Sequence, residues 1–424
     1  MSTWQKVVLS DVLVEKGYIR GPFGSALKRG ELLSEGIPVY EQQHAIYNVR
    51  DFRFYIDETK FESMRRFQVQ TNDLIISCSG TVGKVSIITD QDPKGIISQA
   101  LLLLRANTDI VVPDYLKYFF SSQDGYNAIV SRSSGSVQVN IARREVIENI
   151  PISLPDKSTQ NKIVGVLNAI DRKIKTNNNI NENLLQQAKT LFKSWFVDFD
   201  PFDEPMIEGP SGYQIPQSLK MVQIQELPHI LETGKRPKGG AVSEGIPSVG
   251  AENVKQLGVF DPSSAKYIPH EFAASMKKGK IEGYELLLYK DGGKPGTFTP
   301  HFSMFGEGFP YEEFYINEHV FKLDFNDRGY NEFAYLYMQT DYPYHWLANN
   351  GGKAAIPGIN QQNVNEIWIY HPSHPLVQEF CKWVQPLFTN VFTNCAENMK
   401  LSKLRDTLLP KLMSGELDVS ELDF

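Results

Sequence analysis

The 424-residue sequence lacks the features that mark membrane and secreted proteins. Its apolar runs are short, and none approaches the roughly 20 residues that a membrane-spanning helix needs. The first residues have neither the charged nor the apolar region of a signal peptide. These absences predict a cytoplasmic protein. Since 41% of the residues are hydrophobic, the chain can still bury a sizeable core in each of two ordinary domains.

Cysteine is scarce, and histidine shows no metal-binding pattern. Cys78, Cys381 and Cys395 are an odd number without CxxC spacing, which argues against a disulfide framework and against a cysteine-built zinc site. We therefore expect three reduced, structural thiols. The eight histidines form no HExxH or comparable string, and the close pair His371 and His374 lies in a proline-rich turn. The sequence thus predicts no metal site.

Catalytic motifs are also missing. The string most similar to a nucleotide-binding loop is SGTVGKV at 79–85, but its spacing is not that of GxxxxGK, and a tight turn between strands explains its glycines equally well. No GxGxxG opens a βαβ unit, no Asp/Asn-Pro-Pro-Tyr string of an amino-methyltransferase is present, and the acidic residues form no recognisable nuclease cluster. We expect a chain with no catalytic residues and no cofactor of its own.

An excess of positive charge is lacking too. The formal net charge is -7, and the first 155 residues contain 17 Lys and Arg against 17 Asp and Glu. Bulk charge therefore gives no support for nucleic-acid binding. Any contact with DNA has to come from local patches.

The sequence does contain an internal duplication, which predicts two copies of one fold. The pentapeptide SEGIP occurs at 34–38 and again at 243–247. IPISLP at 150–155 corresponds to IWIYHP at 367–372, an offset of 217 residues. Each copy consists mostly of short β-segments with a few helical ones, which predicts an α+β fold for both.

A heptad pattern follows each copy. Positions spaced alternately by four and three residues form an apolar seam that two asparagines interrupt, and the same pattern recurs 217 residues later. The first seam consists of Ile163, Leu167, Ile170, Ile174, Asn177, Asn181 and Leu184. The second consists of Phe380, Val384, Leu387, Val391, Asn394, Asn398 and Leu401. Both segments are predicted to be long helices.

These helices are predicted to pair with each other. About 33 helical residues span roughly 50 Å, which is more than a small domain needs for its own core. We expect an antiparallel coiled coil with a pseudo-twofold relation between the copies, in which the four seam asparagines hydrogen-bond to each other and fix the register. The alternative is that TNNNIN at 176–181, a poor helix former, marks a bend without a pairing role.

The chain is therefore predicted to consist of five parts. The first globular domain spans 1–155 and the central helix 156–197. An acidic segment rich in Pro and Gly, 198–216, is predicted to be a linker. The second globular domain spans 217–372 and the C-terminal helix 373–424.

Loops in both copies carry side chains that can contact DNA phosphates or base edges. In the first domain the candidates are Arg20, Ser25, Lys28, Arg29, Gln42, Gln43, Ser79, Thr81, Lys84, Arg132, Ser134, Gln138 and Arg143. In the second they are Lys235, Arg236, Lys238, Asn253, Lys255, Lys290, Lys294, Asn350, Lys353 and Gln361. Three of these are predicted phosphate clamps, namely Lys235, Arg236 and Lys238. Four are predicted base readers of the amide type, namely Gln42, Gln43, Asn253 and Gln361.

Two variable α+β domains, each followed by a long helix, resemble the specificity subunits of type I restriction-modification systems over nearly the whole chain. The segments that carry the resemblance are NDLIISCSGTVGKVSII (72–88), SVQVNIARREVIENIPISLP (136–155), QNKIVGVLNAIDRKIKTNNNINENL (160–184) and LLPKLMSGELDV (408–419). The second copy departs in detail, with DGGKPG in place of SGTVGK and Val377 in place of Gln160.

The resemblance implies that each domain is a target recognition domain for one half of a bipartite, asymmetric DNA site, and that the helices set the gap between the halves. It further implies two methyltransferase subunits and restriction subunits as partners, with S-adenosylmethionine, ATP and magnesium belonging to those partners. Two alternatives stay open: a non-DNA protein scaffold built on a coiled coil, and the recognition arm of another multi-subunit defence system. The target sequence and the gap length do not follow from the sequence.

Overall fold

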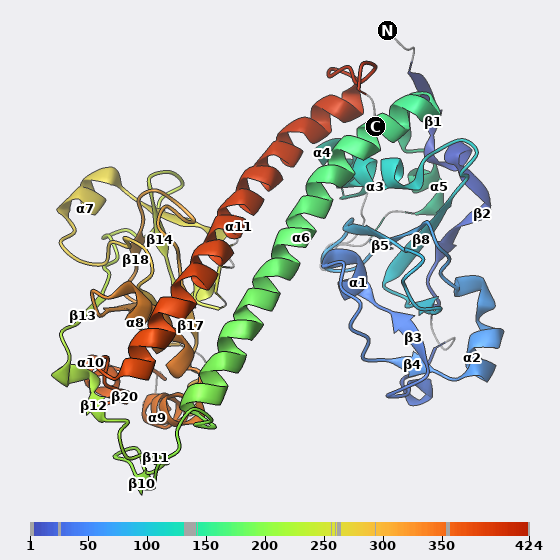
Figure 1. Cartoon of the computed structure of the whole chain (residues 1–424). Coiled ribbons are helices and arrows are strands. Elements are labelled where there is room, and N and C mark those ends of the chain that lie inside the picture. Colours follow the sequence, from blue (N-terminus) through green and yellow to red (C-terminus); the bar gives the residue numbers. More distant parts are fainter. Residues whose placement is uncertain are drawn as a thin grey trace. The chain divides into compact units, whose positions relative to one another are not determined.

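The computed structural model describes residues 4–23, 27–130, 141, 143–255, 257–258, 260, 264–292, 294–352 and 357–422 (Figure 1). The chain divides into two compact units. Unit 1 comprises Met1–Arg172 with Leu401–Phe424, and unit 2 comprises Lys173–Lys400. Each unit combines small sheets with helices, so the predicted α+β class is confirmed.

Unit 1 contains a four-stranded antiparallel sheet, a three-stranded sheet and a two-stranded sheet. The first has the order β2 (Leu13–Arg20), β8 (Leu101–Ala106), β5 (Asp73–Ser77), β6 (Val85–Ile87). The second has the order β4 (Tyr55–Ile56), β3 (Ile37–Tyr40), β7 (Ile96–Ile97), and the third pairs β1 (Gln5–Val8) with β9 (Pro151–Leu154). The helices of unit 1 are α1 (Gln42–Ile46), α2 (Glu58–Ser63), α3 (Pro113–Ser121), α4 (Gln123–Val130) and α5 (Arg144–Glu148).

The apolar runs of the central strands β5 and β8 follow from their position between two cores. Side chains alternate between the two faces of a strand. Leu74 and Leu102 pack into the core on one face, whereas Ile75 and Leu103 pack into the core on the other. Both faces are therefore buried, and the strands contain no alternating polar residues.

Unit 2 repeats this strand order. Its sheets are β13 (Ile230–Thr233), β19 (Val320–Asp324), β16 (Leu286–Tyr289), β17 (Phe302–Met304); then β15 (Lys266–Ile268), β14 (Ile246–Val249), β18 (Tyr315–Ile316); then β12 (Met221–Gln223) with β20 (Trp368–Tyr370). Its helices include α7 (His270–Ser275), α8 (Arg328–Tyr337), α9 (Asp341–Gly351) and α10 (Gln361–Asn365). The β14–β18 pair is parallel, as is the β3–β7 pair. The repeated strand order agrees with the duplication seen in the sequence.

The segment predicted to be a plain linker forms a hairpin instead. Strands β10 (Met206–Glu208) and β11 (Gln214–Pro216) pair antiparallel, and Ile215 is buried in the core of unit 2. Pattern reasoning missed the hairpin because β10 is exposed along its whole length and the turn is rich in Pro and Gly.

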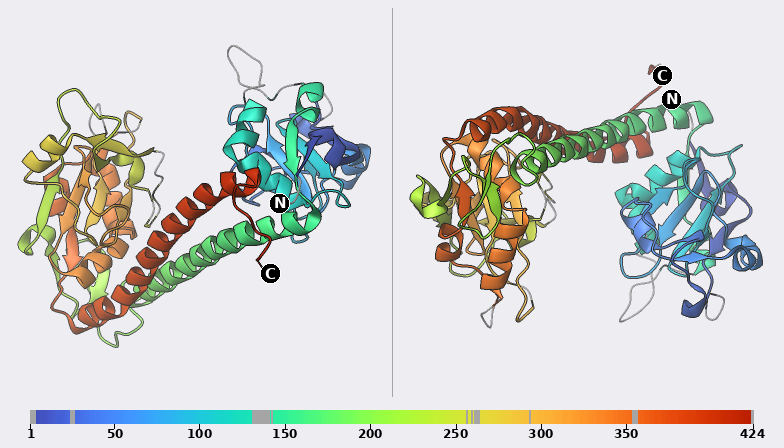
Figure 2. Two further views of the ribbon diagram at one scale, coloured as in Figure 1. Left: turned by 90° about the horizontal axis from the view of Figure 1, so that it is seen from above. Right: turned by 60° about the horizontal axis from the view of Figure 1, so that its bottom comes forward.

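Each long helix contributes to both units. Helix α6 covers Lys157–Phe196 and α11 covers Pro375–Ser414, 40 residues each, or about 60 Å. Within each unit, the segments of α6 (green) and α11 (red) lie side by side (Figure 1 and Figure 2). In unit 1, Ile163 and Leu167 share a core with Leu409 and Leu412.

The asparagines hydrogen-bond across the seam of unit 2, as predicted. Asn177 Nδ2 donates to Asn398 Oδ1 at 2.9 Å, and Asn394 Nδ2 donates to Asn181 Oδ1 at 2.8 Å. Because the partner number falls as the number along α6 rises, these helix segments run antiparallel. Residues 176–181 are helical throughout, so the alternative of a bend without a pairing role is wrong.

The apolar seam positions differ in burial. Those buried are Ile163, Leu167, Ile170, Phe380, Val384 and Val391. Those half-buried are Ile174, Leu184, Leu387 and Leu401. The side chains of α11 from Phe380 to Val391 also pack into the core of unit 2, so this helix joins the unit as well as its partner helix.

A buried carboxyl group on α8 makes the stability of unit 2 depend on pH. Glu332 is fully buried, and its Oε1 lies 3.3 Å from Arg328 Nε. Its Oε2 has no partner among the described residues. Burial raises the pKa of Glu332 to about 8, although Arg328 acts in the opposite direction. The folded chain therefore keeps this proton at neutral pH.

Glu332→Gln is expected to flatten the pH dependence of unfolding. Between the ordinary carboxyl pKa and pH 8, the folded form holds a proton that the unfolded form has released, so the free energy of unfolding falls as pH rises. The variant should gain about 3 kcal/mol at pH 8 and little at pH 5. Denaturant titrations at both pH values measure this, with the exposed Glu379→Gln as the control. The same pH dependence in Glu332→Gln and in the unaltered chain would contradict it.

Candidate nucleic-acid interface

The structure places most of the predicted DNA-contacting residues on loops at the ends of the sheets. Five of them lie outside the described residues, namely Ser25, Arg132, Ser134, Gln138 and Lys353. For the other candidates, the exposure of each side chain and its hydrogen-bond partners show whether it faces solvent or holds a loop in place.

In unit 1, helix α1 and the β5–β6 turn meet through Gln42. The backbone N–H of Ser79 donates to Gln42 Oε1 at 3.3 Å. Thr81 and Lys84 are exposed in the same turn, and Lys84 Nζ lies 5.1 Å from the ring centroid of Tyr126. Because β5 and β6 pair antiparallel around it, the glycine-rich string 79–85 is a turn between strands, one of its two predicted interpretations.

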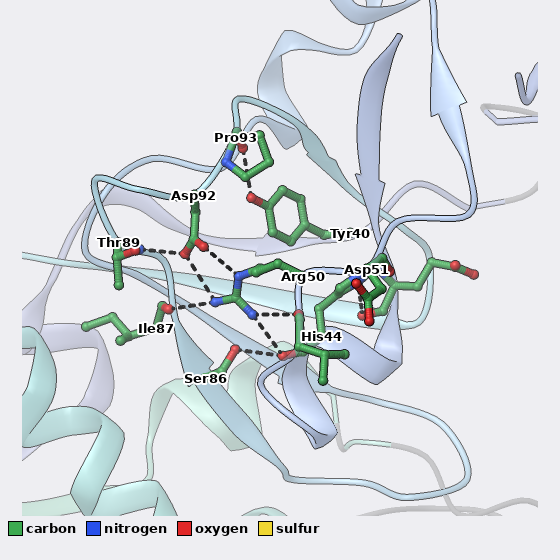
Figure 3. Close-up of polar contacts among 11 residues, drawn as sticks. Tyr40, His44, Arg50, Asp51, Ser86, Ile87, Thr89, Asp92 and Pro93 are labelled. Atoms are coloured by element: carbon green, nitrogen blue, oxygen red, sulfur yellow. Dashed lines mark hydrogen bonds and ion pairs between the residues drawn. The ribbon is translucent and has the colours of Figure 1, made fainter. Parts of the chain in front are cut away.

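A network around Arg50 holds α1 beside this turn (Figure 3). Arg50 Nε and Nη2 donate to the two carboxylate oxygens of Asp92 at 2.7 and 3.1 Å, and Nη2 also donates to the Ile87 carbonyl at 3.1 Å. The ring nitrogens of His44 each lie 3.0 Å from a carbonyl oxygen, those of Glu41 and Asp51. Burial lowers the pKa of His44, so its neutral form is favoured. The network positions helix α1, which begins at Gln42.

The other predicted DNA-contacting side chains of unit 1 differ in their solvent exposure. Gln43 Nε2 donates to the Asp51 carbonyl at 3.1 Å and so supports the loop. Arg20 is half-buried at the end of β2, with its guanidinium carbon 5.5 Å from the ring centroid of Phe23. Exposed cations are Lys28, Arg29 and Arg143.

Two of the predicted cations of unit 2, Lys235 and Arg236, line a pocket of about 150 Å³. Its lining includes Lys235, Arg236, Glu252, Lys266, Glu318 and His319. Arg236 Nη1 lies 3.8 Å from Glu318 Oε1, and Lys266 Nζ lies 2.5 Å from Glu252 Oε1. Lys290, another predicted cation, contacts the rim, because its Nζ donates to the Glu318 carbonyl at 2.9 Å. The pocket rim thus carries both acceptors and donors.

The prediction that Asn253 reads a base needs correction. Asn253 is only 5% exposed; its Oδ1 accepts from Gly250 N at 3.1 Å, and its Nδ2 donates to Ser264 Oγ at 3.1 Å. His44 occupies the equivalent place in unit 1, where its Nδ1 accepts from Glu41 N at 2.6 Å. Both side chains stabilise the loop that follows β14 or β3, and neither faces outward.

The remaining candidates of unit 2 are surface or supporting residues. Gln361 Nε2 donates to the Leu231 carbonyl at 3.0 Å, and Asn350 Nδ2 donates to the Trp346 carbonyl at 3.0 Å. Exposed cations are Lys235, Lys238, Lys255 and Lys294. These four satisfy the geometric requirement for phosphate contacts, since their charged ends reach solvent.

Sequence reasoning missed two residues at this surface, Gln99 and Glu318. Each lies two residues beyond the end of a strand of the three-stranded sheet, β7 in unit 1 and β18 in unit 2. Because β7 pairs with β3 as β18 pairs with β14, the two positions are equivalent. Aligning the copies through this pairing would have found them. The DNA-contacting residues predicted from the sequence are cations, amides and hydroxyls, so an acidic residue such as Glu318 was not among them.

The cysteines, the acidic groups and the helices give no sign of another function among the described residues. The three cysteines are free and buried, and burial raises the pKa of the Cys78 thiol to about 12 and that of Cys395 to about 11. Among the described residues, no three His, Cys, Asp or Glu side chains are grouped to hold a metal ion. None of the helices in that part of the chain combines the length and apolar character of a membrane span.

Comparison with known proteins gives consistent matches. Residues 1–186 match the family described as type I restriction modification DNA specificity domain. The chain is 26% identical over 355 residues to the type I restriction enzyme MjaIX specificity subunit of Methanocaldococcus jannaschii, covering 79% of this chain and 78% of that protein. It is 23% identical over 383 residues to the HindI specificity subunit of Haemophilus influenzae, covering 76% and 81%.

A solved structure is similar over nearly the whole length. The S subunit of a type I restriction-modification system from M. genitalium superposes with a TM-score of 0.57 at 16% identity, covering 97% of this chain and 96% of that one. At this identity the likeness concerns the fold. It extends to both copies of the α+β module and to both long helices.

Proposed function

We propose that this chain is a specificity subunit of a type I restriction-modification system and that it recognises a bipartite DNA sequence. Each unit reads one half of an asymmetric site, and the antiparallel coiled coil of α6 and α11 sets the gap between the halves. The chain docks two methyltransferase subunits, and restriction subunits complete the complex. Methylation and cleavage then reside in those partners.

The observation that supports this proposal most is that equivalent loops carry different side chains in the two units. The strand order is the same in both, but Gln42 follows β3 where Ala251 follows β14, and Gln99 follows β7 where Glu318 follows β18. Like scaffolds with unlike hydrogen-bonding groups match two unlike half-sites.

The helix pair supports the spacing role. Buried asparagines at matched seam positions favour one register over its neighbours, because a shifted pairing leaves their amides without partners. In unit 1, Arg405 Nη1 donates to Asp171 Oδ1 at 3.2 Å, which adds a polar contact in the same antiparallel sense. A fixed register gives a fixed gap.

Selection from a randomised duplex pool tests the function. The full-length chain in complex with its methyltransferase partner is expected to enrich two short motifs at one constant separation. A protein scaffold that does not bind DNA enriches no sequence, so the absence of any motif would contradict the proposal.

Lys235→Ala combined with Lys238→Ala is expected to weaken DNA binding equally for all sequences. Both side chains are exposed beside the pocket, where they can contact phosphates. Each lost phosphate contact should reduce the slope of log K against log salt by about 0.9. Titration at several salt concentrations measures this slope. The matched control replaces the exposed Lys382 and Lys400 of α11 with Ala, and an equal loss of slope in the control would count against a phosphate role.

A further inference from the structure

We propose that Arg236 and Glu318 together read one guanine–cytosine base pair in the half-site of unit 2. The inference rests on the proposed DNA-recognition function and names two residues that determine its specificity. It makes an acidic residue, which sequence reasoning did not consider, a base reader.

The two side chains are placed as a donor and an acceptor side by side. Arg236 lies on the segment after β13, and Glu318 lies two residues after the end of β18. Arg236 Nη1 is 3.8 Å from Glu318 Oε1, and the two side chains are 66% and 31% exposed. They border the 150 Å³ pocket, which is also lined by the predicted phosphate clamp Lys235. Both groups can therefore reach a ligand that enters from that side.

The carboxylate of Glu318 accepts fewer hydrogen bonds than it can. Its Oε1 lies 3.3 Å from His319 Nε2, and its Oε2 has no partner among the described residues. A carboxylate can accept about four hydrogen bonds, and a desolvated oxygen without a donor is costly. Because Oε2 is itself buried, a donor on a base reaches it when the partly exposed side chain turns outward.

The surrounding charges make an acidic side chain tolerable near DNA. Lys235 and Lys266 line the same pocket, and Lys290 Nζ contacts the Glu318 backbone. These cations offset the repulsion between a carboxylate and the phosphates. The carboxylate can then approach a base edge while the lysines contact the backbone.

The pair matches one base pair by its hydrogen-bonding pattern. In the major groove guanine presents two acceptors, O6 and N7, which suit the fork of an arginine, and cytosine presents the N4 amino group, which suits a carboxylate. Adenine also has an amino group, but its N7 acceptor lies beside that group and repels a carboxylate. Glu318 therefore selects cytosine over adenine, and Arg236 contacts the guanine of the same pair.

At the equivalent position of unit 1 the side chain matches adenine instead of cytosine. Gln99 is exposed at the place that Glu318 occupies in unit 2. An amide donates and accepts at once and so matches N7 and N6 of adenine. The change from carboxylate to amide is a direct reason why the two half-sites differ.

Glu318→Gln tests the inference, with selection from a randomised duplex pool by the full-length chain in complex with its methyltransferase partner. The unaltered chain should require C·G at one position of one half-site. In the variant the preference for C·G at that position should fall roughly tenfold or more, because one bidentate or charged contact carries that discrimination, whereas Arg236 still contacts the guanine. Arg236→Ala should weaken the preference at the same position. The other half-site and the gap should stay unchanged.

Glu271→Gln is the matched control, because Glu271 is exposed on α7 of the same unit and does not line the pocket. It should leave the motif unaltered. If Glu318→Gln keeps the cytosine preference, this inference is wrong while the proposed function stands. If the unaltered chain enriches no motif, the proposed function fails and the inference with it.

Discussion

Removing one heptad from each long helix is expected to shorten the gap between the half-sites by about two to three base pairs, because seven helical residues span about 10 Å and each base pair rises about 3.4 Å. The stretches to remove are 169–175 of α6 and 400–406 of α11, which contain the Asp171–Arg405 contact. They spare the seam asparagines and the apolar residues of α6 and α11 that pack into the two cores, but they remove the seam residues Ile170, Ile174 and Leu401. The half-site sequences should stay the same.

The matched control removes residues 169–175 from α6 alone. One helix is then a heptad shorter than its partner and has lost Asp171. The Asn177–Asn398 and Asn181–Asn394 hydrogen bonds can then no longer form together with the packing of Ile163 and Leu167 against Leu409 and Leu412. We expect this variant to lose sequence-specific binding. Motif selection measures both variants, and a paired deletion that altered the half-sites while leaving the gap intact would contradict a spacing role for the helices.

Arg105→Ala is expected to destabilise unit 1 by about 3 kcal/mol, because it leaves a buried carboxylate without its partner. Arg105 Nε and Nη2 donate to the two oxygens of Asp73 at 2.8 Å each, across the β5–β8 pair. The Asp73 side chain is 1% exposed. Burial raises the pKa of Asp73 although Arg105 lowers it, so removing the guanidinium leaves only the unfavourable effect.

Guanidinium titration of the full chain measures this loss. Arg53→Ala is the control, because Arg53 forms an equally short pair with Glu41 but is 65% exposed, and such surface pairs contribute at most about 1 kcal/mol. The double variant Asp73→Asn, Arg105→Met should recover much of the stability, since it buries no charge. A loss in Arg105→Ala no larger than in the control would show that the buried pair is not what stabilises this sheet.

The long helices and their contacts could be predicted because helix pairing depends on local periodicity. A seam of period 3.5 needs only the sequence of each helix, and matched polar positions such as Asn177 and Asn398 have few other ways to find hydrogen-bond partners. The repeated α+β module followed similarly from matching segments. In both cases the information lies in sequence neighbours or in the repeat itself.

The recognition surface could be predicted only in part, because exposure depends on tertiary packing. Asn253 and Gln42 are both amides on short helical segments after equivalent strands, but packing buries Asn253 and leaves Gln42 beside the β5–β6 turn. Glu318 was missed because an acidic residue alone argues against DNA contact. Only its placement beside Arg236 on the pocket rim gives it a role. The β10–β11 hairpin was missed for a related reason, since Ile215 alone anchors it in the core.

The central claim is that two unlike domains read two half-sites at a distance fixed by the paired helices. Mapping of methylated bases in DNA from cells that carry this chain and its methyltransferase partner tests it most directly. The account predicts two different half-sites separated by one constant unread gap, with one methylated base in each half. A single continuous motif, a variable gap, or methylation without sequence preference would contradict it.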